Sequence, residues 1–144
     1  MATEFDVVKY ILDELGEISA MKLQKLVYYS QAWSLVWDEE ELFSEDFEAW
    51  ANGPVLRSLY HEHRGLFKVN ADTFSLGNKE ELTEDQVETI DKVLEFYGDK
   101  SAQWLSNLTH KESPWKDARG TIEAMASSSE VITKGSMEEY YAAL

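Results

Sequence analysis

The sequence predicts a mostly α-helical fold, a single compact helical domain around a long central helix, with a small β-hairpin or short strands as minor elements. Residues 21–37 form the longest run with helical periodicity, and aromatic and aliphatic side chains cover nearly its whole circumference after the first turn. Such a helix needs neighbours on all sides, because apolar surface gains about 25 cal/mol per Å² on leaving water. A chain of 144 residues can supply them from one domain, residues 1–144.

The first two helices have clear start and stop signals. Thr3 is a favourable N-cap for a helix that ends at Gly16, and Ser19 is the expected cap of the central helix, which runs to about Trp37. We therefore expect two helices joined by a short turn.

The segment after the central helix changes character. Residues 38–48 hold seven carboxylates interrupted by apolar side chains, which predicts a turn and then a short extended segment through residues 47–51. Gly53 permits an unusual backbone angle, and Pro54 suits the first position of a helix. A helix from Pro54 to Arg64 is the resulting prediction.

The middle of the chain contains a loop and two further helices. Residues 66–77 have no helical period and predict a loop with one or two short strands. Thr83 and Gln86 form a capping box that opens a helix. Gly98 is expected to end that helix, and Asp99 to cap the next one.

The C-terminal part is also predicted to be helical. Ser113 is the expected cap of a short helix with Pro114 at its first position. Residues 121–126 are helical by composition, and Ser136 with Glu139 forms a second capping box before the last helix.

Composition and charge limit the function. The chain has 28 acidic and 13 basic residues, a net charge of -15, and no basic stripe strong enough to hold a phosphate backbone. A protein partner with a basic surface is therefore favoured over nucleic acid. An acidic composition that only keeps the protein soluble is an equally good explanation. There is no cysteine and no apolar run long enough for a membrane span, so we expect a cytoplasmic protein without membrane association.

No recognisable catalytic or metal-binding motif is present. His61 and His63 lie two residues apart, on different faces of a helix, which is unfavourable for a shared metal. His110 is a conceivable general base oriented by Glu112, but no nucleophile or oxyanion donor is recognisable nearby. We favour a structural role for His110, no enzymatic activity and no cofactor, and keep catalysis through His110 as a third alternative.

The aromatic content is high, with five Trp, seven Tyr and six Phe. Most of these side chains are expected in the core, but Trp50 lies in a polar context and is equally suited to anchor an interface or to fill the core beneath a turn.

Three blocks of the sequence resemble successive motifs of the Panacea domain, the family of SocA-like antitoxins and phage-associated GepA-like proteins. The blocks are residues 21–35, 42–65 and 82–119, and the resemblance extends from Phe5 to Tyr141. The most specific parts are FEAWxxGPVxxxxY, beginning at residue 47, and LTHxExPW, beginning at residue 108.

The resemblance implies a mostly helical antitoxin of a toxin–antitoxin system, which neutralises its cognate protein toxin by direct binding and is normally encoded beside it. One branch of the family also acts as an adaptor to a protease. We expect the partner-binding residues to be Glu48, Trp50, Asn52, Arg57 and Tyr60, with Lys22 and Lys25 behind them. Residues with a structural role are expected to be Trp33, Gly53, Pro54, His110, Pro114 and Trp115.

One hypothesis for the mechanism combines charge and aromatic contact. The acidic segment 38–48 beside Trp50 would cover a basic cleft of the toxin, speeding capture by electrostatic steering. The alternative function is that of an acidic phage or prophage protein that blocks a host defence or nucleic-acid-binding factor by mimicry.

Overall fold

A computed structural model of the chain describes residues 2–123 and 125–144. Most of these residues are helical, and the strands are short and antiparallel, as the sequence predicts. The helices are α1 (Glu4–Leu15), α2 (Ala20–Trp37), α3 (Arg57–His63), α4 (Glu84–Tyr97), α5 (Ala102–Lys111), α6 (Ser113–Arg119) and α7 (Lys134–Ala142), with 3-10 turns η1 (Ala71–Thr73) and η2 (Lys79–Glu81). The strands are β1 (Ile18–Ser19), β2 (Phe47–Trp50), β3 (Gly53–Leu56), β4 (Lys68–Val69) and β5 (Val131–Ile132).

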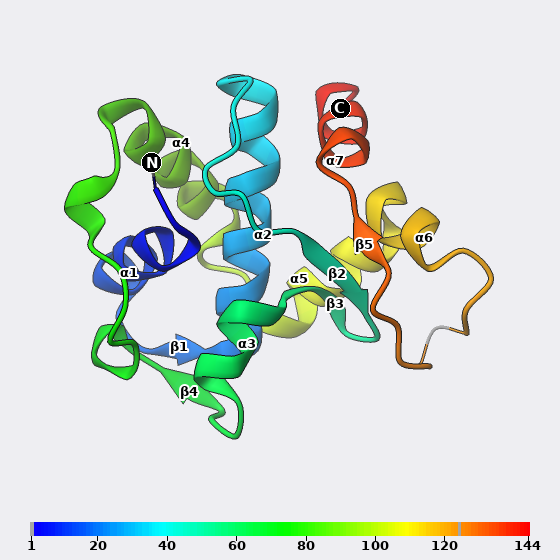
Figure 1. Ribbon diagram of the computed structural model, residues 1–144, viewed down its shortest axis with the longest axis horizontal. Coiled ribbons are helices and arrows are strands. Elements are labelled where there is room, and N and C mark those ends of the chain that lie inside the picture. Colours follow the sequence, from blue (N-terminus) through cyan, green and yellow to red (C-terminus); the bar gives the residue numbers. More distant parts are fainter. Residues whose placement is uncertain (1, 124) are drawn as a thin grey trace.

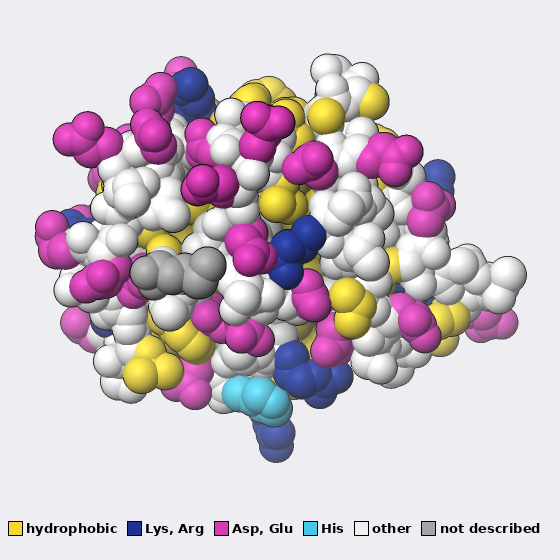
Figure 2. Space-filling model, turned by 45° about the horizontal axis from the view of Figure 1, so that its top comes forward, with side chains coloured by type: hydrophobic (Ala, Val, Ile, Leu, Met, Phe, Trp, Pro, Cys, Tyr) yellow, Lys and Arg dark blue, Asp and Glu magenta, His cyan; other side chains and the backbone are white. Residues whose placement is uncertain are grey.

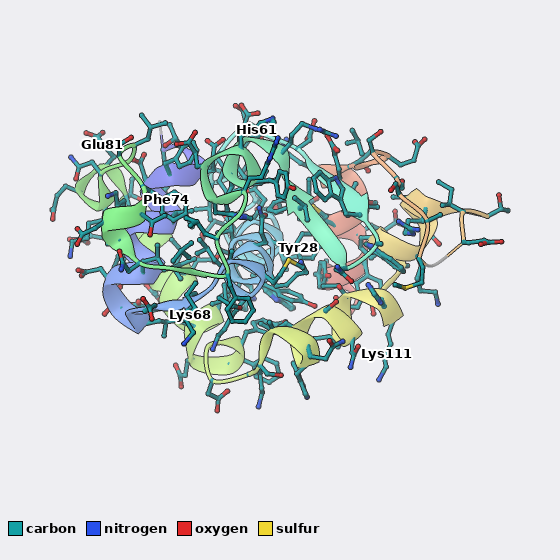
Figure 3. All side chains as sticks on the ribbon, turned by 90° about the horizontal axis from the view of Figure 1, so that it is seen from below. Tyr28, His61, Lys68, Phe74, Glu81 and Lys111 are labelled. Atoms are coloured by element: carbon teal, nitrogen blue, oxygen red, sulfur yellow. The ribbon has the colours of Figure 1, made fainter. Side chains whose placement is uncertain are left out.

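Helix α2 has 18 residues, most of them buried, and contacts α1, α4, α5, α7 and β3. In Figure 1, α1 and α4 lie on one side of α2 and α6 and α7 on the other. Tyr28 of α2 is only 1% exposed and lies near the middle of the molecule in Figure 3, whereas Glu81 and Lys111 lie at its edge. Side chains from these helices and from the sheet residues Phe47 and Ile132 join in one hydrophobic cluster.

Two small sheets complete the fold. Strands β1 and β4 pair next to the start of α2, and β2 lies between β3 and β5 in the other sheet. Figure 1 shows this second sheet between α3 and the C-terminal helices.

Three of the predicted N-caps and two of the predicted helix ends are confirmed. Thr3, Ser19 and Thr83 accept hydrogen bonds from backbone N–H groups in the first turns of α1, α2 and α4, and Gly16 and Gly98 follow the ends of α1 and α4. These interactions join residues only three or four apart, so they are recognisable in the sequence.

Other boundaries were predicted wrongly. Ser101, not Asp99, caps α5; Glu112, not Ser113, is the N-cap of α6; and Thr133, not Ser136, caps α7. The Ser101 and Thr133 side chains accept hydrogen bonds from backbone N–H groups of their helices, whereas the Glu112 carboxylate is bonded to Tyr29 and Tyr141 and makes no capping hydrogen bond.

Residues 121–123 and 125–126 form turns instead of the predicted helix, while residue 124 lies outside the described residues. The carbonyl groups of Glu123 and Ala126 accept hydrogen bonds from the guanidinium of Arg119. These carbonyls are therefore directed to a buried side chain and not along a helix axis.

None of the helices in the described part of the chain has the length and hydropathy that crossing a membrane requires. Within the same residues, no group of three or more His, Cys, Asp or Glu side chains is placed to hold a metal ion.

Candidate functional site

The motif that begins at Phe47 folds into a hairpin. Strands β2 and β3 pair antiparallel, with Trp50 opposite Gly53, and β5 pairs with the other edge of β2. Gly53 has a φ of 120°, and a Cβ atom there would lie 2.5 Å from Cε of Lys25 and 2.9 Å from Oγ1 of Thr109. Glycine is therefore required both by the backbone angle and by the close approach of the hairpin to α2 and α5.

The predicted helix start at Pro54 is wrong, because residues 53–56 form strand β3 and the helix begins at Arg57. The cause is a side chain from α2. The Gln24 amide accepts a hydrogen bond from the Leu56 N–H (2.9 Å) and donates one to the Leu56 carbonyl (3.2 Å). These two bonds take the place of a neighbouring strand and hold Leu56 extended.

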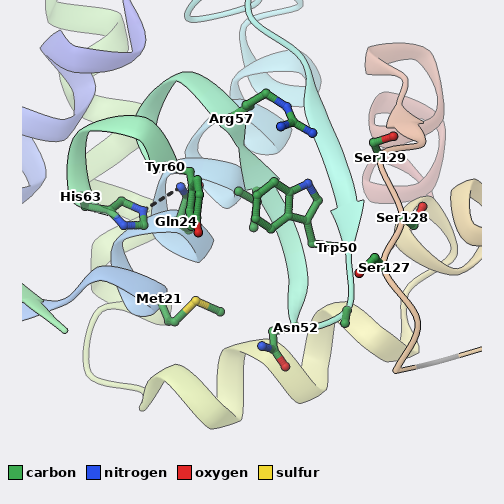
Figure 4. A pocket seen from close by; sticks show the side chains of 12 residues that line it. Met21, Gln24, Trp50, Asn52, Arg57, Tyr60, His63, Ser127, Ser128 and Ser129 are labelled. Carbon is green, nitrogen blue, oxygen red and sulfur yellow. Dashed lines mark hydrogen bonds between the residues drawn. The ribbon is translucent and has the colours of Figure 1, made fainter. Parts of the chain in front are cut away.

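A pocket of about 570 Å³ opens beside the hairpin (Figure 4). The rings of Trp50 and Tyr60 meet edge to face in it, with their centroids 4.9 Å apart. Asn52 and Arg57 also line the pocket, so four of the predicted partner-binding residues lie together. Both aromatic rings are partly exposed, unlike those of the core.

Ion pairing fixes the outer edge of this pocket. The Arg57 guanidinium donates to both carboxylate oxygens of Glu48, at 2.8 and 3.1 Å, and lies 5.5 Å from the centre of the Trp50 ring. The Trp50 indole N–H donates to the same carboxylate at 3.0 Å. The hydrogen bond from Arg57 is the main reason that the pKa of Glu48 is lowered. Glu48 therefore stays ionised and orients two of its neighbours.

His63 forms part of the inner wall. Its Nε2 lies 3.0 Å from the Gln24 side-chain nitrogen (Figure 4), and its ring is in edge contact with Tyr60. Burial lowers the pKa of His63, so the neutral ring is favoured. In the folded chain His63 extends the network that begins at Gln24.

The two predicted lysines do not lie at the pocket mouth. Lys25 is fully buried and donates from Nζ to the Pro54 carbonyl at 3.2 Å. Burial lowers its pKa to about 7. Lys25 thus supports the hairpin from below and has no surface to offer a partner, which corrects its expected placement in the interface. Lys22 is partly exposed at the start of α2, and burial lowers its pKa as well.

The predicted structural residues of the second motif lie behind the hairpin. Trp115 is 6% exposed and donates from its indole N–H to the Trp50 carbonyl at 2.8 Å. His110 stacks on Trp115 with ring centroids 4.1 Å apart. Glu112 accepts hydrogen bonds from Tyr29 and Tyr141, so it does not orient His110 in the way a catalytic pair would require. Pro114 is buried in the first turn of α6, and Trp33 is only partly buried on α2.

Sequence reasoning missed several residues that line the pocket: Met21, Gln24, Val55, His63 and Ser127–Ser129. Met21 and Gln24 are three residues apart, and so are Tyr60 and His63. Residues with this spacing share one face of a helix, and this pattern could have predicted that His63 lies beside Tyr60. The three serines come from a distant loop, whose position beside Trp50 only the tertiary structure reveals (Figure 4).

The acidic segment that follows α2 is partly neutralised by its own chain. Lys134 forms ion pairs with Glu41 and Asp46, and Asp38 accepts a hydrogen bond from Thr89. Glu39 and Glu40 are exposed.

A family model described as antitoxin SocA-like, Panacea domain, matches residues 23–116. This match covers about two thirds of the chain and includes both motifs. The chain belongs to the SocA-like antitoxin family with the Panacea domain. Comparison with curated proteins yields no match, and neither does comparison with solved structures.

The Panacea-domain match runs from α2 to the start of α6 and thus contains most of the hairpin pocket, while Met21 and the serine loop lie outside it. The matched Panacea domain contains the hairpin, the two hydrogen bonds between Gln24 and Leu56, and the ion pair between Glu48 and Arg57.

Proposed function

We propose that this protein is the antitoxin of a toxin–antitoxin system and neutralises its cognate protein toxin by direct binding in the cytoplasm. The toxin would be encoded by an adjacent gene, and the protein would act as a stoichiometric binder and not as an enzyme. The observation that carries the proposal is that the family motif beginning at Phe47 places Trp50, Arg57 and Tyr60 in an open, pre-ordered pocket. Aromatic and arginine side chains of this kind dominate the energetics of many protein interfaces.

The pocket is suited to binding because its side chains are already held in place. The Glu48 carboxylate fixes both Arg57 and the Trp50 indole, so little rotamer freedom remains to be lost when a partner binds. The exposed Glu39 and Glu40, and the net charge of -15, would attract a basic toxin surface and raise the association rate.

The test is co-expression with the neighbouring gene, followed by co-purification. We expect the neighbour alone to stop growth and this protein to restore growth while forming a complex. Trp50→Ala should weaken the complex by at least about 30-fold, as expected for a central aromatic anchor. Phe67→Ala is the matched control, since Phe67 is 76% exposed and lies outside the pocket. A harmless neighbour, or rescue without a complex, would contradict direct neutralisation.

A second candidate function is supported by the surface charge. Asp and Glu side chains are spread over the face shown in Figure 2, with few Lys or Arg among them. Such a surface could imitate nucleic acid and block a host factor that binds it. Under this alternative, reversing Glu39 and Glu40 to lysine should abolish competition with DNA or RNA for the host factor. Under the antitoxin proposal the same reversal should only slow toxin binding and flatten its salt dependence.

A further inference from the structure

A second hollow lies near the C-terminal end of α2. It is a groove of about 510 Å³ between α2, α4 and α5. Its walls include Trp33, Trp37, Phe96 and Trp104, and Glu112 contributes to its floor. The groove shares no lining residue with the hairpin pocket.

The aromatic walls are exposed although they are large. Trp37 is 47% exposed, Phe96 59% and Trp104 42%. Trp33 stacks on Trp37 with ring centroids 4.8 Å apart, and its indole N–H donates to the Tyr97 hydroxyl at 3.0 Å. The rings are therefore held in position by their neighbours, and their outer faces lie beside lysine side chains of the same chain.

Cations of the chain itself already lie over these rings. Nζ of Lys92 is 5.6 Å from the centre of the Trp37 ring, and Nζ of Lys100 is 5.2 Å from that of Trp104. These contacts show that the outer faces of the walls attract positive charge, and a cation from a partner would take the place of the two lysines there.

The carboxylate on the floor lacks a cationic partner among the described residues. Glu112 is 5% exposed, and its Oε1 accepts hydrogen bonds from Tyr29 at 2.7 Å and from Tyr141 at 2.6 Å. No described residue donates a hydrogen bond to Oε2. This atom nevertheless retains some contact with solvent. Burial raises the pKa of Glu112, which reflects the cost of a charge without a counter-charge. A ligand with a positive charge would remove that cost.

We propose that this groove binds an arginine side chain presented by a protein partner, with its guanidinium paired to Oε2 of Glu112 and its flat faces against the aromatic walls. Arginine fits better than lysine because a planar guanidinium stacks on aromatic rings and still donates hydrogen bonds at its edge. Glu88 and Glu95 are exposed carboxylates on α4, the helix that supplies Lys92 and Phe96 to the groove, and they favour a partner whose surrounding surface is basic. The proposal rests on the proposed function only for the identity of the partner, the toxin.

Arginine amide is a direct probe of the groove. In titrations of isotope-labelled protein, we expect it to shift the indole N–H resonances of Trp37 and Trp104. Citrulline amide, which has nearly the same shape without the charge, should leave them in place. Equal shifts with both probes, or none with arginine amide, would overturn the proposal.

Glu112→Gln separates the charge from the structure, because glutamine keeps an acceptor oxygen for Tyr29 and Tyr141. This variant should weaken arginine amide and the toxin by about tenfold or more, the loss of one charge-assisted contact. Glu17→Gln neutralises an exposed carboxylate between α1 and β1 that lines neither the groove nor the hairpin pocket; it is the matched control and should change both affinities little. Should Glu112→Gln fold poorly, Phe96→Ala removes a largely exposed wall and should weaken both ligands while the melting temperature holds.

The outcomes distinguish the two proposals. Binding of arginine amide that depends on Glu112, without growth rescue by the protein, would overturn the antitoxin function and leave the groove assignment intact. Growth rescue with full toxin affinity in Glu112→Gln would overturn the groove assignment and leave the antitoxin function intact.

Discussion

The hairpin pocket and the aromatic groove lie near different ends of α2. They differ in whether the carboxylate at each site has a cationic partner within the chain. At the pocket, Glu48 and Arg57 satisfy each other, and the buried Lys25 is sealed beneath the hairpin. At the groove, Glu112 is held by two hydroxyl groups but faces no cation of the described chain. A sealed charged group can only change its proton occupancy, whereas one at the floor of a groove can also take its counter-charge from a partner.

Replacing Lys25 with Met should have the largest effect on stability. The pKa of Lys25 falls from 10.5 in the unfolded chain to about 7 in the folded chain, which corresponds to roughly 5 kcal/mol of unfolding free energy. Between these values the unfolded chain binds the extra proton, so wild-type stability should rise with pH by up to about 1.4 kcal/mol per unit.

Lys25→Met should therefore be more stable than the wild type at pH 7, and the two should converge near pH 10. Chemical denaturation across this range measures the difference. Parallel pH profiles for the two proteins would show that burial does not lower the pKa of Lys25.

Gly53→Ala tests the close packing of the hairpin and should have the next largest effect. We expect a loss of about 2–4 kcal/mol, the sum of a strained φ and a clash with Lys25 and Thr109. Gly65→Ala is the control, since Gly65 also has a positive φ (87°) but no atom within 4 Å of the added Cβ. Thermal or urea unfolding should show a clearly smaller loss there; equal losses would leave only the backbone angle as the cause.

Arg57→Ala should have the smallest effect on stability. The Arg57 side chain is half exposed, and ion pairs at the surface contribute little to folding. Lys79→Ala, which removes an ion pair with the exposed Asp13 outside the pocket, is the control. We expect similar melting temperatures for the two variants but a weaker toxin complex for Arg57→Ala alone. A marked loss of thermal stability in Arg57→Ala would mean that the ion pair stabilises the hairpin, which would contradict a role in binding alone.

Local sequence determined the predominance of helix and several of its boundaries. Thr3, Ser19 and Thr83 accept hydrogen bonds from backbone N–H groups in the first turn of their own helices. Their role can therefore be predicted without knowledge of the fold. The family motif singled out Trp50, Arg57 and Tyr60 as candidate partner-binding residues, and the structure places all three around one pocket, which their spacing alone does not predict.

Only the tertiary structure decided the features that depend on distant residues. The Gln24 amide makes a strand of a segment whose proline suited a helix start, and the packing of α2 under the hairpin buries Lys25. Glu112 lies with Tyr29 and Tyr141 because α2 and α7 meet at that point, far apart as they are in the chain. Hydrogen bonds and desolvation act through space, and the linear sequence does not record which distant groups will supply them.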